Sequence, residues 1–426
     1  MNIIMSSPVI IKILISLTVI LAADRLIKNL ALSMAIGTLV LALWSGHAPL
    51  SVLSITIDTM LTPDYIILLI MLFLLIWLSS QMKETMMMDD LVKGLQMRLT
   101  GKSLLAVVPA IIGLIPMPGG ALFSAPLVDD CDTDKSMDPY LKTKINYWFR
   151  HMWEYWLPLY AGVILALQIT GLEIWQIAIV NFPLTIFSAA GGYIFLLRKV
   201  KSNGQALTGK KPPVLIYLLP IILIVVLYTV IGLTLPGLKE KSKYLPMGIS
   251  IFLTIVYIQF YRPLTAKKWV KIIFSKSILD MVVVVAVISI YGAFIRAQLP
   301  DGRFLMDIMR DELTASGISP VLLIILLPFI SGFATGIAVG FVGASFPIII
   351  SILGQEPLLK DLLSAVVLAY ASGHIGQLLS PVHVCNIVSN KYFKTDLLKS
   401  TAQLIPLCLF VFAGAAFSIS MIHLVL

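Results

Sequence analysis

The chain has 426 residues, of which 59% are hydrophobic and 12% charged, and its mean hydropathy is +0.97. This balance excludes an ordinary soluble protein and indicates a membrane protein, with apolar runs of spanning length from one end to the other. The net charge of +9 falls largely in the loops, where it indicates orientation in a lipid bilayer and not binding to nucleic acid.

The apolar segments predict an all-α polytopic membrane protein with about ten transmembrane helices. The expected crossings, in chain order, are 8–23, 29–45, 63–82, 144–173, 174–197, 213–235, 244–261, 278–298, 364–392 and 401–424. Two more apolar segments, 103–127 and 319–354, have Pro and Gly in their centres, where a continuous helix would break. We therefore expect two re-entrant hairpins, each entering and leaving the membrane on one side.

The loop charges orient these elements, because cytoplasmic loops of membrane proteins carry an excess of Lys and Arg. The loops with basic residues, expected in the cytoplasm, are 25–28, 83–102, 129–150, 198–211, 262–276 and 391–399. Arg150 is counted among these loop charges. The loop Gly46–Pro63 has no Lys or Arg and is expected outside. Three lysines at 239–243 do not fit the pattern, because they fall in a loop that is expected outside. The cell membrane (inner or plasma membrane) is expected, with both termini extracytoplasmic.

This order gives five crossings and one hairpin in each half, and an odd number of crossings inverts the second half relative to the first. The first repeat, 1–200, is expected to comprise scaffold spans in 8–82, the hairpin 103–127, a broken helix 144–173 and the span 174–197. A cytoplasmic linker follows at 201–212. The second repeat, 213–426, is expected to comprise scaffold spans in 213–298, the hairpin 319–354, a broken helix 364–392 and the span 401–424.

A sequence repeat supports this division at the level of single residues. The pattern Y-x3-H-x2-E/Q-x3-P occurs twice, each position 223 residues from its counterpart. The first copy is Tyr147, His151, Glu154 and Pro158, and the second is Tyr370, His374, Gln377 and Pro381. A Ser-x-Pro triplet likewise recurs in the hairpins, at Ser124 and Ser345. The spacing places the residues of each copy along one side of a helix. Because polar groups that face lipid are costly, this side is expected to face the protein interior.

The polar stripe predicts an ion-coupling layer of His151, Glu154, His374 and Gln377. Histidine titrates near physiological pH, and ionisable groups inside membranes mark ion paths. The prolines of the pattern free backbone carbonyls about one turn upstream, so both helices are expected to be broken. The alternative is that these side chains only form hydrogen bonds between helices. A proton is the favoured coupling ion, with Na⁺ second.

The two hairpin tips predict the substrate site. Glycine lets a backbone turn and approach a ligand, and a half-helix that starts at such a turn offers free N–H groups to an anion. The candidate substrate-binding residues are Pro118, Gly119, Gly120, Ser124, Thr335, Gly343, Ser345, Ser380 and His383. Ser and Thr also join membrane helices without binding a ligand, and His383 could serve only to cap carbonyls freed by Pro381.

The remaining candidate groups predict neither a metal site nor a cofactor. The three cysteines have no metal-binding or disulfide spacing and are expected to be free thiols. They are Cys131, Cys385 and Cys408. Asp129 and Asp130 stand beside further aspartates, which favours a solvated face over a cation site. The segment Lys83–Lys102 predicts a short amphipathic helix on the cytoplasmic side.

Three segments carry a family resemblance: IPMPGGALFSAPLVDD (115–130), SGFATGIAVGFVGASFP (331–347) and SGHIGQLLSPVHVCNIVSN (372–390). They resemble the ion transporter superfamily, which includes arsenite permeases, gluconate permeases, sodium/proton antiporters and sodium-coupled symporters of divalent anions. They are most similar to a family within it that is named only as a domain of unknown function. The resemblance implies a homodimer whose hairpins and broken helices move as an elevator. The paired Ser-Asn-Thr tip motifs of the dicarboxylate symporters are missing, so their sodium coupling and specificity are not implied.

The sequence therefore predicts an ion-coupled secondary active transporter of a small anion, an organic acid. The alternative within transport is a cation/proton antiporter, since the superfamily contains both. An intramembrane enzyme acting on a lipid-linked substrate is the other class. The sequence contains no HExxH, serine elbow or phosphate-binding loop, so we expect no enzymatic activity.

Overall fold

The structure is a computed structural model of the chain, and it describes residues 7–114, 120–132, 136–198, 200, 213–354 and 356–426. Within these residues the chain forms helices and turns, with one isolated antiparallel bridge between Gln298 and Phe304. The predicted all-helical class is confirmed for the part of the chain that is described.

The first five helices in the chain are joined by short loops and are mostly apolar. They are α2 (Val9–Ile27), α3 (Leu30–Trp44), α4 (Pro49–Leu61), α5 (Pro63–Glu84) and α6 (Met87–Gln96). Lys28 ends α2 in the left-handed conformation, and the side chain of Asn29 then accepts a hydrogen bond from the Leu32 N–H at 3.1 Å, which caps α3. The helix α6 buries its apolar side, as the amphipathic prediction for this segment requires.

The rest of the first half contains a helical hairpin and a helix in two pieces. In chain order the elements are α7 (Gly101–Gly113), α8 (Ala121–Asp130), α9 (Pro139–Arg150), α10 (Ala161–Thr170) and α11 (Ile174–Gly191), which continues as a π-helix (Gly192–Leu197). The pair α7 and α8 is called the first hairpin below, and α9 with α10 the first broken helix.

The second half repeats this order with additional short helices. Its elements are α12 (Val214–Thr234), α13 (Pro236–Lys241), α14 (Leu245–Tyr261), α15 (Ala266–Ile273), α16 (Lys276–Arg296), α17 (Leu305–Ser316), α18 (Pro320–Thr335), α19 (Ala338–Leu353), α20 (Leu359–Leu379), α21 (Val384–Phe393), α22 (Leu397–Ala402) and α23 (Ile405–Val425). The pair α18 and α19 forms the second hairpin, and α20 with α21 the second broken helix.

Six helices among the described residues are long and apolar enough to cross a membrane. They are Pro63–Glu84, Ile174–Leu197, Val214–Thr234, Ala266–Arg296, Leu359–Phe393 and Leu397–Val425. Shorter apolar helices such as α3 and α14 occupy two more of the predicted crossings. The chain is thus a multi-pass membrane protein of six long apolar helices with shorter ones between them.

Two of the loop predictions were wrong. The segment Gly46–Pro63, predicted as an outside loop, contains the helix α4, in which Pro49 takes the first position and supplies a fixed φ. Arg150, counted as a cytoplasmic loop charge although it also falls in the predicted span 144–173, is the last residue of α9 and is only 4% exposed. A charge count along the sequence does not reveal whether a basic residue at a helix end faces water or the protein interior.

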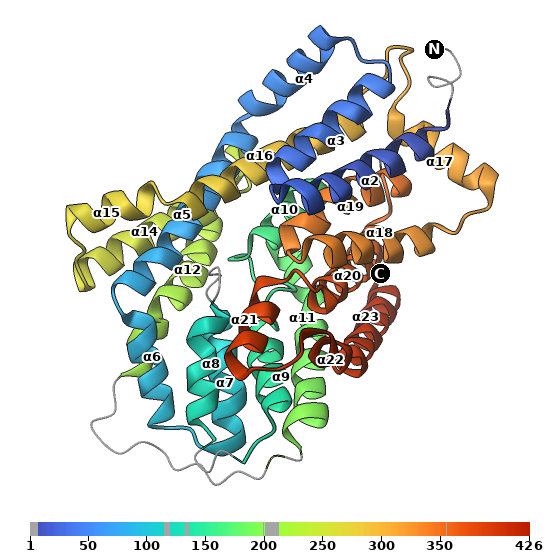
Figure 1. Cartoon of the computed structure of the whole chain (residues 1–426). Coiled ribbons are helices and arrows are strands. Elements are labelled where there is room, and N and C mark those ends of the chain that lie inside the picture. Colours follow the sequence, from blue (N-terminus) through green and yellow to red (C-terminus); the bar gives the residue numbers. More distant parts are fainter. Residues whose placement is uncertain (1–6, 115–119, 133–135, 199, 201–212, 355) are drawn as a thin grey trace.

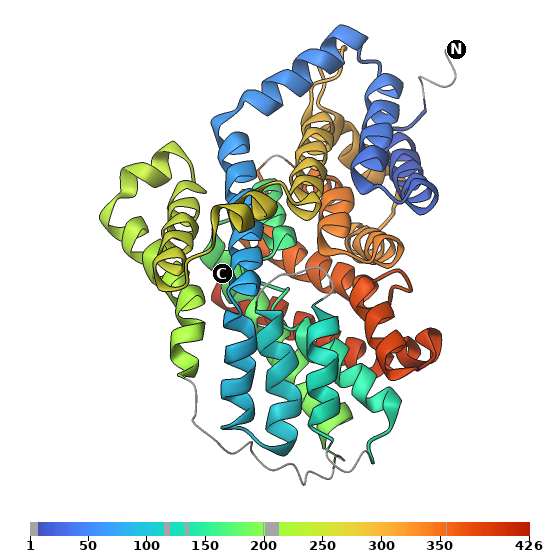
Figure 2. The ribbon, with the colours of Figure 1, turned by 60° about the vertical axis from the view of Figure 1, so that its left-hand side comes forward.

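The hairpins and broken helices pack on one another in the middle of the molecule. The helix α18 runs along α20, α19 contacts both α10 and α20, and α8 contacts α9 and α21. Helices α2, α3, α5, α12, α14 and α16 lie outside this group, with α2 to α4 at one end and α12 to α15 to one side (Figures 1 and 2). The central group therefore joins elements that are far apart in sequence.

Glycine allows the closest of these contacts. A Cβ atom on Gly376 would lie 2.2 Å from the backbone oxygen of Phe329, and one on Gly332 would lie 2.2 Å from that of Gly373. Small residues let membrane helices approach closely, so α18 and α20 pack backbone against backbone. This contact fixes the second hairpin against the second broken helix.

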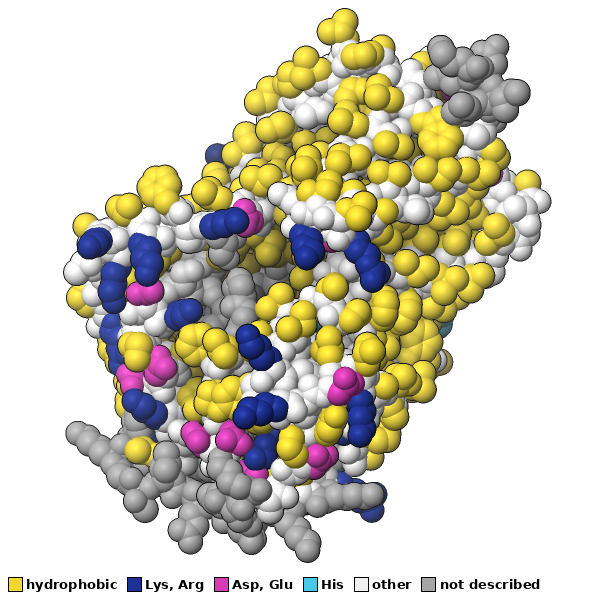
Figure 3. Space-filling view, in the orientation of Figure 1, with side chains coloured by type: hydrophobic (Ala, Val, Ile, Leu, Met, Phe, Trp, Pro, Cys, Tyr) yellow, Lys and Arg dark blue, Asp and Glu magenta, His cyan; other side chains and the backbone are white. Residues whose placement is uncertain are grey.

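The surface divides by side-chain type. Lys and Arg gather over the lower left of the view in Figure 3, whereas the upper and right-hand surface is largely hydrophobic. A hydrophobic surface of this extent on a chain with apolar helices of spanning length fits contact with lipid.

Candidate functional site

The site begins where the two broken helices lose their regular hydrogen bonds. The second halves, α10 and α21, start at Ala161 and Val384, which are as far apart as the hydrogen-bonded counterparts Glu154 and Gln377, at 223 residues. The first halves, α9 and α20, end at Arg150 and Leu379, and these two ends are not separated by the same number of residues. The irregular segment 151–160 is therefore longer than its counterpart Ser380–His383.

This difference gives the two copies of the pattern different surroundings. His151 and Glu154 lie in the irregular segment, whereas His374 and Gln377 lie in the last two turns of α20. Pro158 and Pro381 fall within the breaks, as expected for residues that cannot continue the hydrogen bonding of a helix.

Side chains from neighbouring elements satisfy the carbonyls that the breaks leave open. The Tyr370 hydroxyl donates to the carbonyl of Glu154 at 2.9 Å, and the Tyr147 hydroxyl donates to that of Leu378 at 3.1 Å. Asn181 donates to the carbonyl of Tyr155 at 2.9 Å. The tyrosine of each sequence copy thus holds the break in the other broken helix. Buried carbonyls with partners of this kind indicate that the breaks are built into the fold.

The four predicted coupling residues come together around Glu154. The Gln377 amide donates to Oε2 of Glu154 at 2.7 Å, Nε2 of His374 lies 3.5 Å from the same oxygen, and Nε2 of His151 lies 3.8 Å from Oε1. We call this group the Glu154 cluster; its members are His151, Glu154, His374 and Gln377. Each of these residues is at least nine-tenths buried. Their role in coupling stays a prediction, while their proximity is a structural finding.

His383, predicted to bind substrate, joins the cluster through His151. The Nε2 atoms of the two imidazoles are 3.0 Å apart, and Nδ1 of His383 lies 2.5 Å from the carbonyl oxygen of Gly336 at the tip of the second hairpin. Cys385 stands beside them. One ligand atom from each of His151, His383 and Cys385 lies within 4.8 Å of the other two, so these three side chains could also approach a metal ion.

The predicted hydroxyl ligands all donate to backbone carbonyls. Ser345 donates to Phe341 at 2.6 Å and Thr335 to Ser331 at 2.7 Å, both one turn back in the same helix. Ser380 instead donates to Phe333 at 2.7 Å and so ties the second break to the second hairpin. Ser124 is fully buried in α8 and faces carbonyls of its own first turn at 3.5 Å. These bonds use the hydroxyl proton but leave oxygen lone pairs for a cation.

The predicted glycines and prolines of the tips divide into three groups. Pro118 and Gly119 lie outside the described residues. Gly343 faces the outer helix α16, since a Cβ there would lie 2.5 Å from Ile288. Gly120 faces the guanidinium of Arg150, whose nitrogen would be 2.0 Å from a Cβ at this position.

Sequence reasoning missed Arg150 as a site residue. Its buried guanidinium lies against Gly120, immediately before α8 begins, and its own carbonyl lies against Gly113 at the end of α7. A positive charge beside the start of a helix favours a bound anion. The signal available in the sequence was its position next to His151, inside the repeated segment.

Asn146 was also missed, and it connects two elements of the site. Its amide nitrogen donates to the carbonyl of Ala121 at 3.2 Å and to the Ser389 hydroxyl at 2.9 Å. These bonds join α9 to the first hairpin and to α21. No local sequence pattern predicts this contact, because the partners lie far apart in the chain.

The aspartates after the first hairpin do not all form a solvated face. Lys142 lies 2.8 Å from Asp129 and 2.5 Å from Asp132, and both Lys142 and Asp132 are buried. This group precedes the predicted span 144–173. Burial lowers the pKa of Lys142, but its bonds to the two carboxylates outweigh burial and raise the pKa above its usual value.

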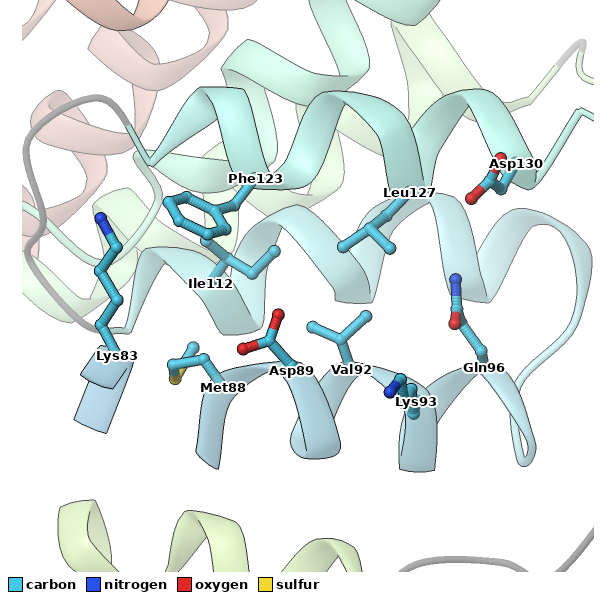
Figure 4. A pocket seen from close by; sticks show the side chains of 10 residues that line it. All are labelled: Lys83, Met88, Asp89, Val92, Lys93, Gln96, Ile112, Phe123, Leu127 and Asp130. Atoms are coloured by element: carbon cyan, nitrogen blue, oxygen red, sulfur yellow. The ribbon is translucent and has the colours of Figure 1, made fainter. Parts of the chain in front are cut away.

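A groove separates α6 from the first hairpin (Figure 4). The Lys83 ammonium lies 4.8 Å above the ring of Phe123, which directly precedes Ser124. The groove is lined by Lys83, Met88, Asp89, Val92, Lys93, Gln96, Ile112, Phe123, Leu127 and Asp130. It is separate from the Glu154 cluster and marks a boundary between the first hairpin and the outer helices.

Residues 10–422 match the family described as "Protein of unknown function (DUF401)". The chain belongs to this family. That agrees with the resemblance to a membrane family named as a domain of unknown function. No curated protein matches this DUF401 chain.

A solved structure matches the fold of this DUF401 protein. It is the crystal structure of the YdaH transporter of Alcanivorax borkumensis, which reveals an unusual topology. The TM-score is 0.56 at 10% sequence identity, over 86% of this chain and 87% of that chain. At this identity the likeness is one of fold, and it extends over most of both chains.

Proposed function

We propose that this DUF401 protein is an ion-coupled secondary transporter of a small anion, an organic acid, in the cell membrane. One observation carries the proposal. Glu154 and Gln377, counterparts in the two halves, share a hydrogen bond beside three histidines where both helices break. Transporters place substrate and coupling-ion sites at discontinuous helices from two repeats. The fold likeness to the YdaH transporter supports the same class.

The charge at the first hairpin supports an anion as the substrate. Arg150 is a buried cation beside Gly120 and the start of α8. A guanidinium can hold a carboxylate with two parallel hydrogen bonds, and a helix start adds N–H donors. An organic acid would contact this tip and the second tip around Thr335 and Ser380.

The composition of the Glu154 cluster favours a proton over Na⁺ as the coupling ion. Hard cations such as Na⁺ take oxygen ligands, whereas imidazole nitrogens bind protons near neutral pH. His151 and His374 lie beside a single carboxylate, Glu154, and His383 contacts His151. This donor set suits proton exchange.

The packing supports an elevator mechanism. The hairpins and broken helices contact one another closely, as at Gly376, and would move as one body past the outer helices. In the complete proposal these outer helices hold a homodimer and the hairpins are re-entrant. About ten crossings then form inverted repeats at 1–200 and 213–426, joined by a cytoplasmic linker at 201–212, which lies outside the described residues. Both termini are then extracytoplasmic.

Flux measurements with purified protein in liposomes test the proposal. An imposed pH gradient should drive uptake of at least one small carboxylate, and an imposed Na⁺ gradient should be less effective. Glu154→Gln should abolish gradient-driven uptake, and Arg150→Gln should raise the half-saturating substrate concentration. Arg303→Gln is a matched control, because Arg303 is exposed and pairs with the nearby Asp301. A wild-type protein that takes up none of the carboxylates under either gradient would refute the proposal.

A cation/proton antiporter would use the same carboxylate without an organic substrate. In liposomes free of carboxylates, an added sodium pulse would then move protons through the wild type and not through Glu154→Gln. Such a result, together with no carboxylate uptake, would favour the antiporter.

A further inference from the structure

Two histidines at the breaks turn the same ring nitrogen toward each other. His151 is the first residue after α9, and His383 is the last residue before α21. Their Nε2 atoms are 3.0 Å apart, and both side chains are buried. The thiol of Cys385, in the first turn of α21, is hydrogen-bonded to both imidazoles. One nitrogen from each ring and the sulfur of Cys385 all lie within 4.8 Å of one another.

Backbone carbonyls hold both rings in this orientation. Nδ1 of His151 lies 2.6 Å from the Tyr147 carbonyl oxygen, and Nδ1 of His383 lies 2.5 Å from that of Gly336. A carbonyl oxygen only accepts hydrogen bonds, so each Nδ1 atom carries the hydrogen of its ring, and each Nε2 atom presents a lone pair. Histidines that bind a metal are held in the same way, with one nitrogen on the metal and the other donating to a carbonyl or carboxylate.

The two facing lone pairs need a partner that accepts electrons from both. The thiol of Cys385 has one hydrogen, which satisfies one Nε2 atom at a time. A metal ion instead accepts both nitrogen lone pairs and the sulfur together. The arrangement of donors therefore favours a metal ion over the thiol hydrogen alone.

We propose that His151, His383 and Cys385 bind a transition-metal ion of the zinc class through the two Nε2 atoms and the sulfur. Zn²⁺ takes imidazole nitrogen and thiolate sulfur in one site, whereas Mg²⁺ and Ca²⁺ take oxygen ligands. The inference assigns His383, a predicted substrate ligand, to the metal site. The sequence predicted no such site, because two of its ligands are 232 residues apart.

The distances require a small adjustment on binding. In a tetrahedral site, Zn–N bonds of about 2.0–2.1 Å place two ligand nitrogens about 3.3 Å apart. The two Nε2 atoms, at 3.0 Å, would therefore move apart by about 0.3 Å. Rotation of the two side chains supplies this movement without a change in the backbone. The fourth ligand position is left to water, as in other zinc sites with three protein ligands.

The charges around the site balance a divalent ion. Cys385 releases its thiol proton to solvent and binds as a thiolate. The Glu154 carboxylate lies 3.8 Å from Nε2 of His151 and supplies the second negative charge. The Arg150 guanidinium lies against Gly120 at the first hairpin. A buried ion with two counter-charges avoids the cost of an unpaired charge inside the protein.

The ion would join elements from both halves of the chain. His151 belongs to the first broken helix, and the other two ligands belong to the second. Nδ1 of His383 extends the connection to Gly336, at the tip of the second hairpin. This structural role does not depend on the proposed function. Glu154 and His374 lie outside the ligand set and remain available for the proposed proton exchange.

Cobalt binding tests the cysteine ligand. Co²⁺ occupies zinc sites and gives an intense near-ultraviolet absorption band when a thiolate binds it. The full chain, without a histidine tag and stripped of metal by a chelator, should bind one Co²⁺ with this band, and added Zn²⁺ should abolish the band. Cys385→Ser should lose it, whereas Cys408→Ser, a matched change at another buried cysteine, should keep it.

Two results of the cobalt titration would overturn the inference. A wild-type protein without the thiolate band is the result expected if the Cys385 thiol only hydrogen-bonds the imidazoles. Equal loss of the band in Cys385→Ser and Cys408→Ser would show that the band does not report this site.

Zinc-dependent melting tests the two histidines. An ion that binds only the folded protein raises its melting temperature. A small molar excess of Zn²⁺ should raise the Tm of metal-free wild type by several degrees, and His151→Gln and His383→Gln should each lose most of this rise. His423→Gln should keep it, because His423 lies in α23 outside the ligand set. A rise of the same size in wild type and His383→Gln would overturn the inference.

X-ray absorption at the zinc edge needs no variant, so it tests the site even if a substitution prevents folding. For zinc-loaded wild type we expect two nitrogen ligands at about 2.0–2.1 Å and one sulfur ligand at about 2.3 Å. A shell of nitrogen and oxygen alone would overturn the inference.

Discussion

Gly376→Ala tests whether α18 and α20 must pack backbone against backbone. The added Cβ would lie 2.2 Å from the Phe329 carbonyl oxygen and 3.0 Å from its carbon, whereas ordinary contact begins at 3.4 Å. Backbone atoms cannot rotate out of the way, so α18 must shift by about 1 Å. Overpacking of this kind costs about 1–3 kcal/mol or more, and the better helix propensity of Ala offsets about 1 kcal/mol. We expect a net loss of about 1–2 kcal/mol.

Thermal unfolding of the purified protein in detergent measures this effect against a matched substitution. Gly248 lies in α14 with no atom within 4 Å of an added Cβ, so Gly248→Ala should be neutral or stabilising. Gly376→Ala should melt several degrees below both wild type and Gly248→Ala. It should also slow carboxylate uptake, because the displaced hairpin loses its contact with His383. Equal melting temperatures for the two alanine variants would refute the backbone contact as described.

Two further predictions concern hydrogen bonds and pH. Tyr370→Phe removes the donor to the Glu154 carbonyl and should cost about 1 kcal/mol of unfolding free energy. Tyr244→Phe should cost nothing, because the buried Tyr244 hydroxyl has no partner among the described residues. Equal losses of unfolding free energy in the two variants would contradict this prediction. Because the Lys142 pKa is raised, its ion pairs stabilise the fold below the usual lysine pKa of 10.5 and lose this effect as pH rises through the raised value. Wild type should therefore lose its stability advantage over Lys142→Met in melting curves above pH 10.5, and a constant difference at all pH values would contradict the assignment.

Local sequence predicted most helix positions and failed where tertiary contacts decide. The predicted span 174–197 coincides with α11 and its π-helical extension, and 244–261 coincides with α14 within one residue, because long apolar runs leave little choice of conformation. Arg150 was placed in a loop because composition cannot report that a helix end turns inward. The Glu154–Gln377 contact was suggested by the sequence repeat, since counterparts in two related halves tend to meet at their shared axis.

The grouping of His151, His383 and Cys385 was not predictable from spacing. His383 is 232 residues from His151, and neither lies in a metal or proton motif recognisable along the chain. The fold brings them together because His151 leaves α9 and His383 enters α21 at the same point in space. The pairing of Asp129 and Asp132 with Lys142 escaped prediction for a similar reason, since a cluster of acids gives no sign of which one is buried.

The unequal length of the two breaks has a consequence for the free energies of the inward-facing and outward-facing forms of a carrier. A carrier with two identical inverted halves would have inward-facing and outward-facing forms that mirror each other and have equal free energy. Here one half unwinds from His151 to Tyr160 and the other only from Ser380 to His383. Under the proposed function, the inward-facing and outward-facing forms therefore differ in internal hydrogen bonding, and the empty carrier at rest favours one side of the membrane even without a gradient.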